Sequence, residues 1–199
     1  MKVPSLVKYK KLSKSVFFIL KAFYRITLVL TILSLLLIIG VRFLPDHFYA
    51  LNFSSDGAFG VSPDNIIRFE IPQERIDGVN LTPIYSAILM GFFMTLLIVS
   101  MILRQLKVIT KNVSENHPFH EMNAKSILYI GYAVVAGSLL VPISKAYTVN
   151  QVIRTFNFSH VKAVYTVNVE GFFIGILLIL LSSIFHYGAL LQQEYDTTL

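Results

Sequence analysis

Four apolar stretches, each close to the length that crosses a lipid bilayer, constrain this chain more than any other feature. They lie at about 17–43, 83–103, 127–144 and 171–191. A spanning helix needs roughly 20 apolar residues. Of the 199 residues, 55% are hydrophobic and 14% are charged, which is too apolar for an ordinary soluble domain. The sequence therefore predicts a single all-α membrane domain over 1–199, built as a bundle of four transmembrane helices.

The charges beside these stretches predict how the chain is oriented. Lys and Arg next to spanning segments gather on the cytoplasmic side of a membrane. The first 25 residues contain seven Lys and Arg and no acidic residue, and the 104–126 loop is also basic, whereas 44–82 is mainly acidic. We therefore expect the N- and C-termini and the 104–126 loop in the cytoplasm, with the 44–82 and 145–170 loops outside.

The basic N-terminus predicts a lipid partner. Apolar residues recur there at helical spacing while lysines fall on another face, as in a helix that lies at the membrane surface. Together with the net charge of +6, this favours anionic lipid headgroups over nucleic acid. The alternative is a dock for a cytoplasmic partner.

The two outer loops contain patterns typical of short strands. Residues 66–71, 152–158 and 161–169 are rich in β-branched and aromatic residues. Turns are expected at Asp56-Gly57, at Asp77-Gly78 and near 157–160. We expect these segments to form a small extracytoplasmic β-rich cap over the bundle.

Several kinds of chemistry find no support in the sequence. Cysteine is absent, and the middles of the spans contain no charged residue or histidine, which argues against ion-coupled carriers. His117, His120 and His186 are conceivable metal ligands, but a His-x-x-His pair across a proline lacks a defined geometry. Ser182 and Ser183 near His186 lack an orienting acid, so we expect hydroxyls bonded to their own helix. The prediction is no catalytic residue, no metal and no cofactor.

Small residues in the last two spans predict close helix packing. Gly171 and Gly175 form a Gly-x-x-x-Gly pattern, and residues 133–137, which end at Gly137, repeat the small-residue spacing. Such spacing lets helix backbones approach one another. We expect packing within the bundle, with homo-oligomerisation as the alternative.

Two segments carry a family resemblance. Residues 115–119, followed by Asn123, and residues 184–198 resemble the inner loop and C-terminal tail of an uncharacterised family of bacterial four-helix membrane proteins, domain of unknown function 2975. The resemblance implies a bacterial inner or plasma membrane protein, often encoded beside a small helix-turn-helix regulator. It implies no activity.

These observations favour a non-enzymatic membrane protein that holds or regulates a small cytoplasmic partner through the inner loop and the tail. The predicted partner-binding residues are Asn116, Pro118, Phe119, Asn123, His186, Tyr187, Gln193, Glu194 and Asp196. The alternative is a small carrier or immunity-type protein that binds a lipid or apolar peptide in the bundle or the outer cap. A cavity between the helices would favour this alternative, and its expected lining is Tyr129, Tyr132, Ser138 and Ser182.

Overall fold

The structure is a computed structural model, which describes residues 4–43, 58–61, 69–72, 79–115 and 117–197. Side chains are described from Ser13 onward, except those of 58–61, 69–72 and Asp196. The turns predicted at Asp56-Gly57 and Asp77-Gly78 lie outside the described residues, as does Asn116.

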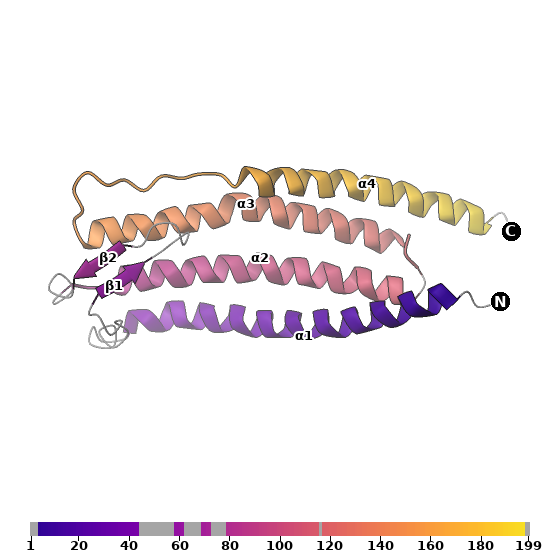
Figure 1. Ribbon diagram of the computed structural model, residues 1–199, viewed down its shortest axis with the longest axis horizontal. Coiled ribbons are helices and arrows are strands. Elements are labelled where there is room, and N and C mark those ends of the chain that lie inside the picture. Colours follow the sequence, from indigo (N-terminus) through magenta and orange to yellow (C-terminus); the bar gives the residue numbers. More distant parts are fainter. Residues whose placement is uncertain (1–3, 44–57, 62–68, 73–78, 116, 198–199) are drawn as a thin grey trace. The chain divides into compact units, whose positions relative to one another are not determined.

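Four long helices make up most of the chain (Figure 1). They are α1 (Pro4–Gly40), α2 (Thr82–Ser114), α3 (Glu121–Thr155) and α4 (Val169–Thr197), and a short 3-10 helix, η1 (Val41–Phe43), extends α1. Each predicted span lies within one of these helices or its extension, and all four helices are long and apolar enough to cross a membrane. The prediction of a mainly helical chain with four membrane-compatible helices is confirmed.

The chain forms two compact units, and α1, α2 and α3 contribute to both. Unit 1 contains Met1–Thr31, Thr95–Leu139 and Asn168–Leu199, and unit 2 contains Ile32–Met94 and Leu140–Val167. The predicted inner loop and both termini therefore fall in unit 1. The predicted outer loops fall almost entirely in unit 2.

Unit 2 has a small apolar core where α1 ends and α2 begins. Its buried residues are Val41, Leu81, Ile84, Val152 and Phe156. The start of α2 is fixed by Asn80, whose Oδ1 accepts the N–H of Thr82 at 2.9 Å. This is the side-chain cap that helix N-termini favour, because it satisfies a backbone donor that has no partner inside the helix.

The predicted β-rich cap is not supported: of the three expected strands, the described residues contain part of one. Among the described residues, the sheet consists of two antiparallel strands of four residues each, β1 (Ala58–Val61) and β2 (Phe69–Pro72). The strand expected at 66–71 overlaps β2, and its first three residues lie outside the described part. Residues 161–168 form no strand.

Most of the strand expected at 152–158 is instead the end of α3. Val152 and Phe156 are both buried, and a spacing of four residues places them on one face of a helix. Helical geometry buries both side chains in the core of unit 2, which outweighs the β preference of the local sequence. Asn157 then ends the helix with a positive φ of 49°, so the turn expected near 157–160 is present.

In unit 1, α3 and α4 pack closely at two glycines. A Cβ atom built on Gly175 would lie 2.6 Å from Cγ2 of Val135, and one built on Gly131 would lie 3.0 Å from the carbonyl oxygen of Gly175. Gly137 instead faces Ile98 of α2, with 3.2 Å from the added Cβ to Cγ2. Gly171 faces the side chain of Asn168 just before its own helix. Gly175 and Gly137 therefore contact other helices of the same chain, whereas Gly171 does not.

Candidate partner-binding surface

A buried asparagine shapes the turn between α2 and α3. Asn123 is 1% exposed, and its Nδ2 donates to the carbonyl oxygens of Pro118 at 2.9 Å and His117 at 3.2 Å. Its Oδ1 accepts a bond from Nδ2 of Asn112 at 2.8 Å. One side chain therefore satisfies two turn carbonyls and ties them to α2, because buried polar groups are costly unless they are paired.

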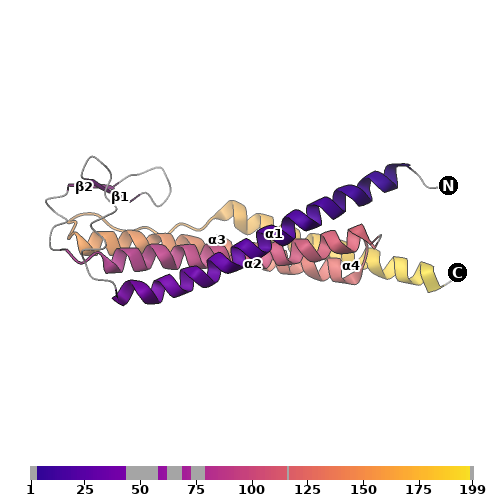
Figure 2. The same ribbon diagram turned by 90° about the horizontal axis from the view of Figure 1, so that it is seen from below.

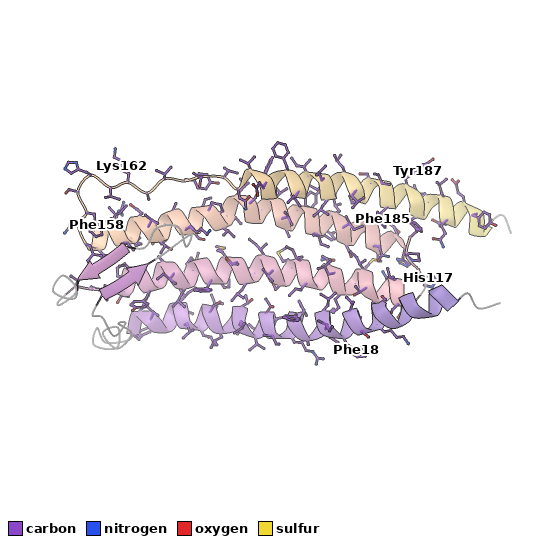
Figure 3. The ribbon with its side chains drawn as sticks, viewed as in Figure 1. Phe18, His117, Phe158, Lys162, Phe185 and Tyr187 are labelled. Atoms are coloured by element: carbon purple, nitrogen blue, oxygen red, sulfur yellow. The ribbon has the colours of Figure 1, made fainter. Side chains whose placement is uncertain are left out.

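The turn packs on α4 through an aromatic pair and a glycine. The rings of Phe119 and Phe185 have centroids 5.9 Å apart, within the range of favourable aromatic contacts. A Cβ atom built on Gly188 would lie 3.2 Å from Cδ1 of Phe119, so a residue with a side chain would crowd the ring. Figure 3 shows Tyr187 directed away from α3, and it is 64% exposed. The two segments that carry the family resemblance thus meet here.

A pocket of about 520 Å³ lies beside this contact. Two elements of unit 1 line it: the α2–α3 turn and the last turns of α4. The lining residues are His117, Phe119, His120, Glu121, His186, Ala189, Leu190, Gln192, Gln193 and Thr197. We call residues 117–123 and 186–197 the turn–tail surface. The pocket lining combines imidazoles, amides and one carboxylate with apolar side chains.

An ion pair sets the charge at one edge of the pocket. Nζ of Lys125 lies 2.8 Å from Oε1 of Glu121. Both residues precede the apolar stretch of α3 at 127–144. The hydrogen bond and charge of Lys125 lower the pKa of the Glu121 carboxyl, and Glu121 in turn raises the pKa of Lys125. Because more than half of each side chain is exposed, the pair adds little to folding. Its effect is to keep this edge ionised.

His120 and Ser182 make hydrogen bonds that stabilise helices. Nδ1 of His120 accepts the N–H of Met122 at 3.1 Å and so caps α3. The hydroxyl of Ser182 donates to the carbonyl oxygen of Ile179 at 2.6 Å, as expected of a serine bonded to its own helix. Within the part of the chain that the structure describes, no three His, Cys, Asp or Glu residues are placed to hold a metal ion.

The structure gathers most of the predicted partner-binding residues. Phe119, His186 and Gln193 line the pocket, while Pro118 and Asn123 shape the turn. Tyr187 and Glu194 are exposed on the same part of α4 without lining the pocket. Asn116 and the side chain of Asp196 lie outside the described residues.

Seven lining residues, and the glycine that seats Phe119, were not predicted as partner-binding. The lining residues are Glu121, Ala189, Leu190, Gln192 and Thr197, together with His117 and His120, which the sequence suggested only as metal ligands. A signal was present in the tail, because residues 186, 189, 190, 193 and 197 recur at the spacing of one helix face.

Four helices that can cross a bilayer and a polar surface at the end of two of them are the features of a multi-span membrane protein. Residues 69–199, which include this surface and helices α2 to α4, match the family described as "Protein of unknown function (DUF2975)". The chain belongs to that family. No curated protein and no solved structure matches the chain.

Proposed function

We propose that this chain is a non-enzymatic protein of the bacterial cell membrane that holds a small cytoplasmic protein on the turn–tail surface. The observation that carries the proposal is the pocket, which both resemblance-bearing segments line. In their family context, the expected partner is a helix-turn-helix regulator.

The exposed side chains of this surface support a protein partner. Phe119, Leu190 and Tyr195 are exposed by about half or more, and the polar residues Gln192, Gln193 and Glu194 lie between the last two. Apolar and aromatic groups rimmed by polar residues are typical of protein interfaces, where a few buried anchors supply most of the affinity.

The position of the surface in unit 1 agrees with a cytoplasmic location. The first turns of α1, the α2–α3 turn and the last turns of α4 lie at the same end of unit 1 (Figures 1 and 2). The N-terminal part of α1 carries the strongest basic excess in the chain. By the positive-inside rule, this end faces the cytoplasm.

The carrier alternative gains no specific support. Tyr129 and Tyr132 are each 53% exposed, and the hydroxyls of Ser138 and Ser182 donate to carbonyls of their own helices. These side chains therefore do not supply the common polar lining that a ligand cavity between the helices needs.

Two neighbouring leucines offer a matched test. Leu190 lines the pocket and Leu191 does not, yet they are 46% and 48% exposed. The full chain is co-expressed with a candidate helix-turn-helix regulator and captured from detergent extracts. Leu190→Asp is expected to weaken capture about 30-fold, the loss typical of an interface anchor, while Leu191→Asp retains most of it.

Membrane insertion of both variants is measured in parallel, so that a folding defect is recognised. Equal capture by Leu190→Asp and the parent chain would contradict the proposal. Equal loss in both variants would also contradict it, because the pocket would then have no special part in binding.

A further inference from the structure

Two basic stripes run along the parts of α1 and α2 that belong to unit 1. Lys14, Lys21 and Arg25 are separated by seven and four residues, and Arg104, Lys107 and Lys111 by three and four. These spacings return to the same face of a helix. No acidic residue occurs in 4–43 or in 82–114, so neither helix supplies a carboxylate to these six cations.

The contacts between α1 and α2 bring the stripes together. The hydroxyl of Ser13 donates to the carbonyl oxygen of Thr110 at 2.9 Å, and Nζ of Lys107 lies 4.4 Å from the centroid of the Tyr24 ring. On α1 the centre of the basic stripe lies about a quarter of a turn around the helix from Ser13 and Tyr24. On α2 it lies about a quarter of a turn from Thr110, in the same rotational sense. Because the two helices are antiparallel, both stripes lie on one side of the pair.

The α3 helix leaves that side open. It contacts α2 through Asn112 and Ile98, whose mean direction around α2 lies roughly a third of a turn from the centre of the basic stripe. Lys14, Arg25 and Arg104 are accordingly exposed. The cations therefore form a continuous basic face on unit 1.

The register of the helices sets the depth of this face. Ile98 of α2 faces Gly137 of α3. Because these helices are antiparallel, a step of six residues toward the α2–α3 turn on each helix brings Arg104 level with Gly131. Gly131 packs on Gly175, which lies within the apolar run of α4 at 172–181. Arg104 is therefore level with the apolar part of α4.

A bilayer whose hydrocarbon covers the apolar part of α4 must therefore reach the level of the basic face, so that this face lies beneath the membrane surface. At this level α4 exposes Leu177 by 63% and Leu180 by 59%, as a lipid-facing helix does. Cations held near hydrocarbon are costly, and they draw phosphates and water toward them. Charge complementarity therefore selects an anionic amphiphile that supplies both a phosphate and acyl chains.

We propose that the basic face of α1 and α2 binds the headgroup of an anionic phospholipid, with Arg104 and Lys107 as its main phosphate contacts. The Tyr24 ring holds Lys107 at the centre of the face. This site is separate from the turn–tail surface and does not depend on a protein partner. It also differs from a general basic flank, because Arg104 lies level with the apolar part of α4.

The absence of tryptophan from the chain permits a local test. Tyr24→Trp retains an aromatic ring beneath Lys107 and places one fluorophore in the site. The full chain is reconstituted with phosphatidylcholine that contains a minor fraction of brominated phosphatidylglycerol or brominated phosphatidylcholine. Bromine quenches tryptophan only near contact. In the Tyr24→Trp variant, the brominated phosphatidylglycerol is expected to bind beside the fluorophore about fivefold better than the brominated phosphatidylcholine.

Matched variants identify the source of this preference. Arg104→Gln with Lys107→Gln is expected to reduce the fivefold preference to nearly one, whereas Arg154→Gln with Lys162→Gln removes the same charge elsewhere and leaves it intact. Leu177→Trp, on the exposed face of α4, reports lipid away from the site and is expected to show equal quenching.

A second measurement covers the case in which Tyr24→Trp does not fold. The thermal stability of the unmodified chain in neutral detergent is expected to rise with phosphatidylglycerol and not with phosphatidylcholine or free glycerol phosphate. Equal quenching by both lipids, the same preference at positions 24 and 177, or a preference that survives the Arg104 and Lys107 changes would overturn the proposal. Equal stabilisation by glycerol phosphate would also overturn it, because the ligand would then be a free phosphate.

Discussion

The backbone N–H of Asn168 donates a hydrogen bond to the carbonyl oxygen of Ser138, with 3.2 Å between the two atoms. Four residues after Ser138 stands Pro142, which has no N–H to donate. The carbonyl of Ser138 thus lacks its usual partner within α3, and the start of α4 provides one. Oδ1 of Asn168 also accepts the N–H of Gly171 at 2.9 Å, so the same residue caps α4.

Removing this cap is expected to weaken the fold. Asn168→Ala should lower the free energy of unfolding by about 1 kcal/mol, because the N–H of Gly171 loses its acceptor. Asn168→Asp keeps an acceptor at that position and should retain most of the stability. Chemical unfolding in detergent measures both variants. Equal stability of the alanine and aspartate variants would show that the cap contributes nothing.

The four helices could be predicted from the sequence because each apolar stretch is itself long enough to cross a bilayer. The contacts between them could not. The bond from Asn168 to Ser138 depends on where α4 begins relative to α3, and no local sequence pattern encodes that relative position. The β-rich cap was not supported for a related reason: the spacing of Val152 and Phe156 fits a strand as well as a helix, and the core of unit 2 that buries them is assembled from residues far away in the sequence.

The contact of Gly175 with α3 predicts a strong packing effect. Gly175→Leu should reduce the free energy of unfolding by at least about 2 kcal/mol, since even a Cβ atom would lie 2.9 Å from the backbone nitrogen of Val135. Gly40 has no atom within 4 Å of such a Cβ. Gly40→Leu is therefore the control and should be neutral or slightly stabilising. Similar unfolding of both variants in detergent would remove Gly175 from the packing contact.

The candidate site was predicted in outline for a different reason. Phe119 and the tail residues lie in segments with a family resemblance, which marks them without showing what they touch. The side chain of Asn123 acts through bonds to the turn and to Asn112 on α2, and Gly188 acts through its contact with Phe119, which is far away in the sequence. Only the helical spacing of 186, 190, 193 and 197 was available in advance to indicate that these residues share a face.

The buried amide of Asn123 leads to a prediction about the turn. Asn123→Ala should reduce the free energy of unfolding by about 2 kcal/mol, because two turn carbonyls lose their donor in a buried site. Asn112→Ala removes only the bond to Oδ1 of Asn123 and should cost less. Unfolding in detergent measures both changes. A larger effect from Asn112→Ala would mean that the turn does not depend on Asn123.

The basic flanks predict the topology of the chain. A reporter enzyme fused after Leu199 should be active in the cytoplasm, and one inserted near position 55, which is outside the described residues, should be active on the other side. Reporter pairs that work only in one compartment measure this directly. A cytoplasmic signal from both positions would contradict the four-span arrangement with both termini inside.

The charge of the C-terminal tail gives the last prediction. If the turn–tail surface holds a cytoplasmic protein, replacing Glu194 and Asp196 by Lys should weaken its capture at least tenfold and leave membrane insertion unchanged. The reason is electrostatic, because like charges placed across a complementary interface can cost several kcal/mol, while exposed tail charges add little to folding. Capture is measured at matched expression and at two salt concentrations. The defect should shrink at high salt, since screening weakens repulsion between exposed charges. Equal recovery of the partner at low salt would remove the tail carboxylates from the binding surface and leave the pocket around Leu190 to account for any binding.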